Sequence, residues 1–242
     1  MSIAGFFSES IEFRLPHPAL DDSILLIAHN AICRALDLLR NHPPNGFSLA
    51  TAHENAITQQ LEWILENRLR KSGEVPGFDE RVFHKVRRGP EVTNFNGQHP
   101  SKKPDLVFDL ARDEPLVLST LDALFVECKI VDDPRSITAN YCNLGLSRFI
   151  NGDYAWAMQE GMMLAYTRQE HTLSASLCSV MAHDPLYTAL GLPSELALVP
   201  NCQSYTYAEL LHVTCHQRAF YWPDGKGPAG LIRIFHSWHN CS

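Results

Sequence analysis

The stretch Ala123–Val131 constrains the fold of this chain most, because two charged residues stand inside an apolar run. Side chains of an extended strand point alternately to opposite faces. The apolar face of this strand, which suits a core, carries Leu124, Val126, Cys128 and Ile130. Glu127 and Lys129 share the other face, where burying charges is unfavourable unless a partner or a ligand compensates them. The stretch therefore predicts a buried strand that carries a functional site.

A second strand is predicted at Pro104–Leu110, where Asp105 and Asp109 share one face. If this strand pairs with the first, Asp105, Glu127 and Lys129 converge above one face of the sheet. Asp109 lies two residues further along, so we expect it at the surface or in a supporting role rather than as a ligand.

Two carboxylates beside an ammonium group suit metal-assisted hydrolysis of a phosphodiester. Asp105 and Glu127 offer the hard oxygen ligands that Mg²⁺ or Mn²⁺ prefers, and the backbone carbonyl of Cys128 offers a third. A bound divalent cation lowers the pKa of its water and polarises the phosphate. Lys129 would orient that water or stabilise the growing charge, and we expect it to stay cationic among carboxylates.

The rest of the chain alternates helical and strand patterns. Asp21–Leu39 has a helical apolar stripe, and a second helix is predicted from Thr51, where Thr51-x-x-Glu54 has the form of a capping box. Val82–Arg88 predicts a basic strand, followed by a loop over Glu91–Lys103. Helices are predicted further on at Ile137–Ile150 and Tyr154–Arg168, then strands at Thr172–Met181, Leu210–His216 and Leu231–Phe235, with mixed structure over Pro185–Pro200.

These patterns predict an α/β (α+β) protein with one domain. Hydrophobic residues make up 45% and charged residues 19% of the 242 residues, which excludes disordered, collagenous and coiled-coil proteins. We divide the domain into an N-terminal helical segment (1–50), a catalytic core (51–170) and additional strands and helices (171–242) that offer an interface.

Lys103-Pro104-Asp105, followed 22 positions after the aspartate by Glu127-Cys128-Lys129, resembles the PD-(D/E)xK motif of the restriction-endonuclease-like nuclease superfamily. The resemblance implies an αβββαβ core, with a mixed sheet flanked by helices, over roughly Thr51–Arg168. An extra N-terminal helix and a C-terminal extension would be added to that core.

The resemblance also implies further residues around the motif that assist metal binding or contact the phosphate. Family members often carry an acidic residue on the preceding helix that assists metal binding, and Glu54 occupies that place, although the capping box explains it equally well. A basic or polar group near the scissile phosphate often follows the lysine strand. Arg148, or Gln159 with Glu160, would be that group.

A basic segment precedes the motif in an otherwise acidic chain. Residues 68–103 contain nine basic and four acidic residues, a net charge of +5, against −7 for the whole chain. The predicted nucleic-acid-binding residues are Lys85, Arg87, Arg88, Lys102, Lys103 and Arg148. The alternative is a solvated edge strand whose charges discourage strand pairing. The acidic total predicts weak unaided DNA affinity, and therefore a helicase or ATPase partner that delivers the DNA.

The expected function is a Mg²⁺- or Mn²⁺-dependent DNA nuclease, and the resemblance suggests an effector of bacterial anti-phage defence or restriction. Cutting both strands with one centre requires two nicks or a homo-oligomer. One alternative is a catalytically inactive nuclease-like scaffold or binding subunit. Another is a zinc-dependent hydrolase or zinc-stabilised module that uses C-terminal residues: His212, Cys215, His216, His236, His239 and Cys241.

The sequence also favours a cytoplasmic protein without a membrane segment. The seven cysteines are odd in number and never spaced C-x-x-C, which favours reduced thiols. The first residues lack the basic flank and long apolar stretch of a signal peptide, and no apolar run is long enough to span a bilayer.

Overall fold

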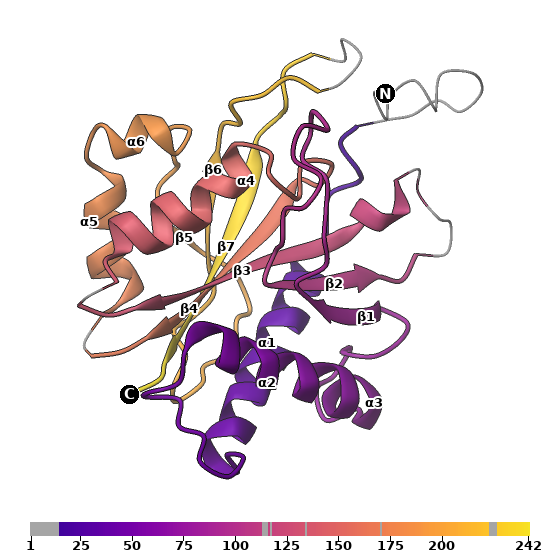
Figure 1. The fold of residues 1–242 in the computed structure, drawn as a ribbon, viewed down its shortest axis with the longest axis vertical. Helices are drawn as coiled ribbons and strands as arrows, with labels where there is room; N and C mark the ends of the chain where they lie inside the picture. Colours follow the sequence, from indigo (N-terminus) through magenta and orange to yellow (C-terminus); the bar gives the residue numbers. More distant parts are fainter. Residues whose placement is uncertain (1–14, 113–115, 117, 134, 170, 223–226) are drawn as a thin grey trace.

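The structure is a computed structural model, which describes residues 15–112, 116, 118–133, 135–169, 171–222 and 227–242 (Figure 1). The expectation about a signal peptide falls on residues 1–14, which lie outside the described residues. Within the described residues, no helix is both long enough and apolar enough to cross a membrane.

Seven strands of the described chain form one mixed sheet in the order β1-β2-β3-β4-β7-β6-β5. The strands are β1 (Phe83–Arg88), β2 (Leu106–Leu110), β3 (Ala123–Val131), β4 (Glu160–Thr167), β5 (Ala197–Leu198), β6 (His212–His216) and β7 (Ile232–Asn240). The central strands β3, β4 and β7 are parallel to each other. The outer strands pair antiparallel.

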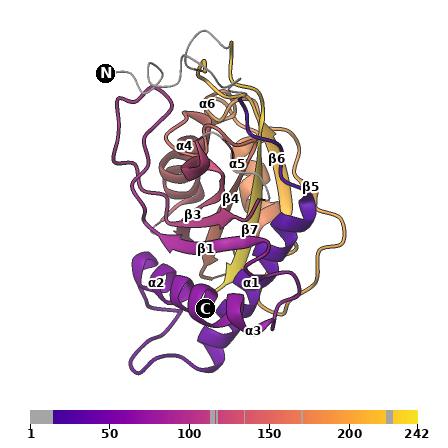
Figure 2. The same cartoon turned by 90° about the vertical axis from the view of Figure 1, so that its right-hand side faces the viewer.

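Helices cover both faces of this sheet (Figures 1 and 2). One layer comprises α1 (Asp22–Asn41), α2 (Glu54–Ile64) and its continuation through η2 (Leu65–Leu69) and α3 (Arg70–Ser72). The other comprises the π-helical η4 (Ile137–Leu146), α4 (Ser147–Ile150), η5 (Leu173–Leu177), α5 (Cys178–Met181) and α6 (Leu186–Ala189). A short 3-10 turn, η3 (Ser119–Leu121), precedes β3. The predicted α/β class and the mixed sheet flanked by helices are confirmed.

Several predicted elements are confirmed with small changes of length. The helix predicted at 21–39 is α1, and its N-cap Asp21 accepts a hydrogen bond from the Ser23 amide at 2.8 Å. The helix predicted at 137–150 is η4 with α4, and the predicted strand at 123–131 is β3. Strands were also correctly placed at β1, β2, β6 and β7, although β7 continues to Asn240.

Two predicted elements are wrong. The helix predicted over residues 154–168 is instead a connection followed by β4. Because β4 lies between β3 and β7 and is buried on both faces, its residues form a continuous apolar run that resembles a buried helix. The strand predicted over 172–181 is instead helical, as η5 and α5. Its buried residues Leu173, Leu177 and Met181 recur every four positions, which is a helical spacing.

The helix α4 packs closely on β4 because Gly161 has no side chain. A Cβ at Gly161 would lie 2.6 Å from Cε1 of Phe149, whose ring is fully buried. This contact fixes the distance from α4 to the sheet, and so the reach of the neighbouring Arg148 towards β3.

We expect Gly161→Ala to lower the free energy of unfolding by about 1–3 kcal/mol, because the new methyl group overpacks a rigid ring. Gly230→Ala is the matched control, since a Cβ there would lie 3.8 Å from Trp222, an ordinary contact. We expect the control to stay within about 0.5 kcal/mol of wild type. Urea denaturation of both variants measures the difference, and equal stabilities would contradict this account of the packing.

Candidate active site

The candidate site is built along an edge of β3 that β2 leaves open. The pairing of β2 with β3 ends where Leu106 faces Val126, so β3 continues for five residues without that neighbour. Two backbone N–H groups on this edge donate to carboxylates instead. The Cys128 amide donates to Oδ2 of Asp105 at 2.7 Å, and the Ile130 amide donates to Oε2 of Glu54 at 3.0 Å. Buried backbone donors require acceptors, and here the acceptors are two of the predicted site residues.

Glu54 is the first residue of α2 and serves the site rather than a capping box. The helix begins at Glu54, its N-cap is His53, and no side-chain cap bond closes its first turn. The predicted Thr51–Glu54 capping box is therefore wrong. A carboxylate at a helix N-terminus also interacts favourably with the helix dipole, which helps to hold Glu54 in place.

The ammonium group of Lys129 lies among four oxygen atoms. It donates to Oε1 of Glu127 at 2.6 Å and to the carbonyl oxygen of Cys128 at 2.8 Å. Oε1 of Glu54 lies 3.5 Å away, and Oδ2 of Asp105 lies 3.7 Å away. These four oxygens are the metal ligands that the sequence predicts, so the structure brings that complete set together around a single cation.

Close packing by η4 holds the lysine in this position. A Cβ at Gly145 of η4 would lie 3.3 Å from Cγ and 3.4 Å from Cε of Lys129. Burial by itself lowers the pKa of Lys129, but the carboxylates of Glu127, Asp105 and Glu54 outweigh it and raise the pKa above its ordinary value. The surroundings therefore favour the ammonium form.

Glu127 is fully buried and both of its oxygens accept hydrogen bonds or ion pairs. Oε1 contacts Lys129 and, at 3.2 Å, Nη1 of Arg148, while Oε2 accepts a hydrogen bond from the hydroxyl of Tyr154. Burial and repulsion from Asp105 raise the pKa of Glu127 to about 7, although Lys129 and Arg148 oppose the rise. Burial also raises the pKa of Glu54, against the attraction of Lys129. The site thus contains a carboxyl group that titrates near neutral pH.

The other residues predicted to assist at the site differ in whether they reach it. Arg148 reaches the site and is 38% exposed, so its guanidinium lies at the boundary with solvent. Gln159 and Glu160 do not reach it. Gln159 donates to the His17 carbonyl at 2.9 Å, and Glu160 pairs with Arg233 at 2.9 Å on the far end of β4.

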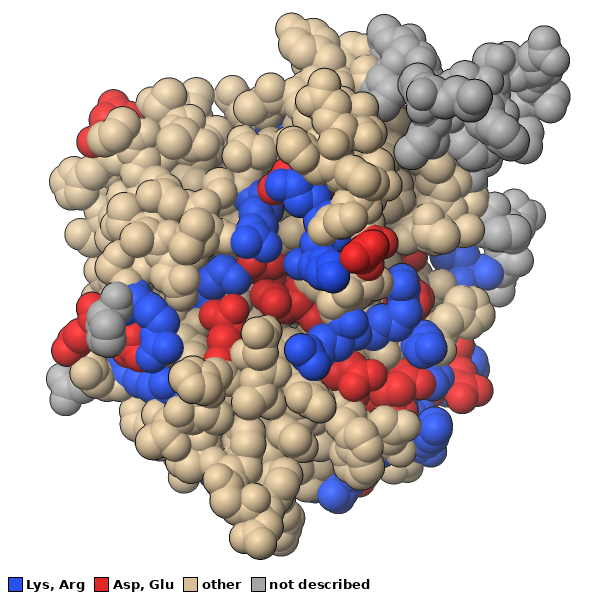
Figure 3. Space-filling view, viewed as in Figure 1, with Lys and Arg blue, Asp and Glu red and all other residues tan. Residues whose placement is uncertain are grey.

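Figure 3 shows Lys and Arg side chains, in blue, around a central group of Asp and Glu side chains, in red. Three of the predicted nucleic-acid-binding residues are paired with carboxylates at the surface: Arg87 with Asp109 (2.5 Å), Lys102 with Asp153 (2.9 Å) and Lys103 with Glu91 (3.1 Å). Lys85 and Arg88 are exposed on β1. Asp109 supports Arg87 and lies apart from the ligand set, as expected.

Tyr154 is the site residue that the sequence reasoning missed. Its hydroxyl donates to Glu127 from the connection between α4 and β4, a segment predicted to be helical. Tyr154 lies 27 positions from Glu127, so no short sequence pattern links the two residues. Their contact depends on the path of that connection.

The C-terminal histidines and cysteines do not assemble as one cluster in the described part of the chain. His216 and His236 both contact the Thr214 hydroxyl, at 2.6 and 2.8 Å, inside the core. Of the six predicted residues, His239 alone belongs to a described group with metal-binding spacing, and its companions there are His29 and Cys33.

Comparison of the chain with protein-family models, curated proteins and solved structures finds no match.

The pKa of Glu127 has a measurable consequence for stability. Its ordinary value is 4.5 and its folded value is about 7. Between these values the folded protein holds a proton that the unfolded chain has released, so stability falls as the pH rises through this window and is level above it. Glu127→Gln lacks this titration. In the presence of EDTA, we expect the free energy of unfolding of the variant, relative to that of wild type, to rise by up to about 3 kcal/mol between pH 4.5 and pH 8.

Urea unfolding of both proteins across that pH range measures the gain. Glu91→Gln is the control, because it removes a carboxylate at a half-exposed surface pair with Lys103, outside the site. A difference between Glu127→Gln and wild type that does not change with pH would contradict a buried, proton-binding Glu127.

Proposed function

We propose that this chain is a Mg²⁺- or Mn²⁺-dependent nuclease that hydrolyses phosphodiester bonds of DNA. The observation that carries the proposal is the set of four oxygens, from three carboxylates and one carbonyl, around the Lys129 ammonium. The order of elements from α2 through β1, β2, β3, η4–α4 and β4 also supports it. This order of helix, three strands, helix and strand agrees with the αβββαβ core that the motif resemblance implies.

The donor set fits the metal that the proposal requires. All four donors are hard oxygens, the class of ligand that Mg²⁺ and Mn²⁺ prefer, and the ammonium group marks a position where a cation is stabilised. Asp105, Glu127, Glu54 and the Cys128 carbonyl would hold the ion. When bound, the ion supplies Lewis acidity and a water molecule of lowered pKa.

The remaining residues of the site orient and protect this chemistry. Tyr154 and Arg148 fix the buried carboxylate of Glu127, and the Cys128 amide fixes that of Asp105. Lys129 would have to leave the centre of the oxygen set to admit a metal, because two cations cannot share it. Its ammonium group would then donate to a water molecule or to a phosphate oxygen. Arg148, at the boundary with solvent, would bind a second phosphate oxygen.

The surface charges favour a DNA-delivering partner in this proposal. Arg87, Lys102 and Lys103 already pair with carboxylates, which reduces the positive potential available to a DNA backbone. A helicase or ATPase subunit would supply the missing affinity, in keeping with the defence or restriction role that the resemblance suggests.

Cleavage of plasmid and linear DNA tests the proposal directly. We expect wild type to cut DNA with Mg²⁺ and not with EDTA. Asp105→Asn and Lys129→Ala should each lower the rate by about 10²-fold or more, because each removes a group that acts on the transition state. Asp109→Asn is the matched control, since Asp109 lies in β2, four residues after Asp105, and binds Arg87 rather than Lys129. Absence of Mg²⁺-dependent cleavage by wild type would favour the inactive scaffold instead.

The position of Lys129 predicts how the metal affinity responds to its removal. Because the ammonium competes with a divalent cation for the same oxygens, we expect Lys129→Met to bind Mg²⁺ at least about tenfold more tightly than wild type while losing cleavage. Lys103→Met is the control, because Lys103 pairs with Glu91 at the surface. Calorimetric titration with Mg²⁺ measures both. Equal or weaker binding by Lys129→Met would show that the metal does not use the oxygens around Lys129.

A further inference from the structure

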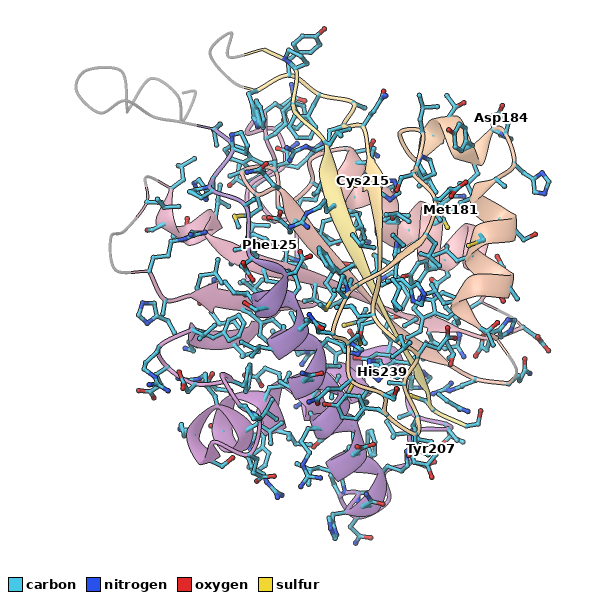
Figure 4. All side chains as sticks on the ribbon, turned by 180° about the vertical axis from the view of Figure 1, so that it is seen from behind. Phe125, Met181, Asp184, Tyr207, Cys215 and His239 are labelled. Atoms are coloured by element: carbon cyan, nitrogen blue, oxygen red, sulfur yellow. The ribbon has the colours of Figure 1, made fainter. Side chains whose placement is uncertain are left out.

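A second group of ligand-type side chains lies between α1 and β7, in the core. His29 and Cys33 are four residues apart on α1 and so share one face of the helix. His239 faces them from β7, close to α1 in the view from behind (Figure 4). All three are buried, with exposed fractions of 0%, 2% and 2%.

The spacing of these side chains suits a shared metal ion. One ligand atom of each residue lies within 4.8 Å of the other two. Sγ of Cys33 lies 3.5 Å from Nε2 of His29. A tetrahedral zinc ion with ordinary bond lengths places a sulfur and a nitrogen ligand about 3.6 Å apart. The helix therefore already presents two of its donors at coordination distance.

Ser237 orients both imidazole rings. Its hydroxyl contacts Nδ1 of His29 at 2.8 Å and Nε2 of His239 at 2.7 Å. Metal-binding histidines commonly have their second ring nitrogen held by such a neighbour, which fixes the ring rotation and the tautomer. In His29 this contact leaves Nε2 directed at Cys33.

The alternative is that Cys33 packs here as a small apolar side chain. A thiol is a weak hydrogen-bonding group, so facing an imidazole nitrogen in the core adds little stability by itself. Coordination of the same two atoms to a metal would add much more. The donor set is one sulfur and two imidazole nitrogens, without a carboxylate, and this set selects zinc over magnesium.

We propose that His29, Cys33 and His239 bind a zinc ion that joins α1 to β7. The Cys33 thiol releases its proton to solvent as the sulfur–zinc bond forms. Three protein ligands leave one coordination position. The Tyr205 ring lies against the group, edge-on to His29 with the ring centroids 6.3 Å apart. Because the ion is buried, its role is structural, and the proposal does not depend on nuclease activity.

Titration of the metal-free full chain with Zn²⁺ and Co²⁺ tests this site. We expect a thiolate-to-cobalt charge-transfer absorption and a rise in melting temperature, whether or not the oxygen site also binds the added ion. Cys33→Ser should remove the absorption and the rise, and His239→Gln should weaken binding by tenfold or more. Asp105→Asn should leave both signals intact, which separates this site from the oxygen site.

Cys142→Ser is the matched control, because Cys142 is also a buried thiol on a helix but lies outside the group. It should retain the cobalt absorption. Absence of the absorption in wild type, or its persistence in Cys33→Ser, would overturn the proposal even if a variant proves unstable.

Discussion

The open edge of β3 is the constraint on which the candidate site depends. The strand continues beyond its antiparallel neighbour, and the N–H groups of Cys128 and Ile130 then face a side with no strand. A buried backbone donor must find an acceptor. The carboxylates of Asp105 and Glu54 accept these hydrogen bonds. The same requirement that completes the hydrogen bonding of the sheet therefore concentrates negative charge at one point of its edge.

Concentrated negative charge in turn explains the position of Lys129. Three carboxylates lie within 4 Å of one ammonium group. They repel each other, and this repulsion is offset only while a cation lies between them. The raised pKa of Glu127, near 7, shows that one lysine and one arginine do not fully offset burial and mutual repulsion. Under the proposed function, such a site would gain from exchanging a singly charged ammonium group for a divalent ion. That gain links the packing of the strand to the proposed chemistry.

The sequence carried most of the information about this site because strand alternation and short spacing determine it. The convergence of Asp105 with Glu127 follows from pairing two neighbouring strands, and both strands were predicted. The role of Glu54 was left open, since a capping box and a site position use the same residue, and only the observed start of α2 decides between them. Tyr154 gave no signal, because its contact depends on a loop path. The strand β4 was misread because a strand buried on both faces has no alternation.

The two faces of the sheet separate two kinds of donor. Along β7, His236 and Trp238 face η4, where both contact the Tyr141 hydroxyl, whereas Ser237 and His239 face α1. The nitrogen and sulfur donors beside α1 are thus divided by the sheet from Lys129, which packs under η4. Hard oxygen donors gather at an edge that meets solvent, and softer donors gather in a closed interior. Under the two proposals, a metal at the first position would meet a substrate, whereas one at the second would hold α1 and β7 together.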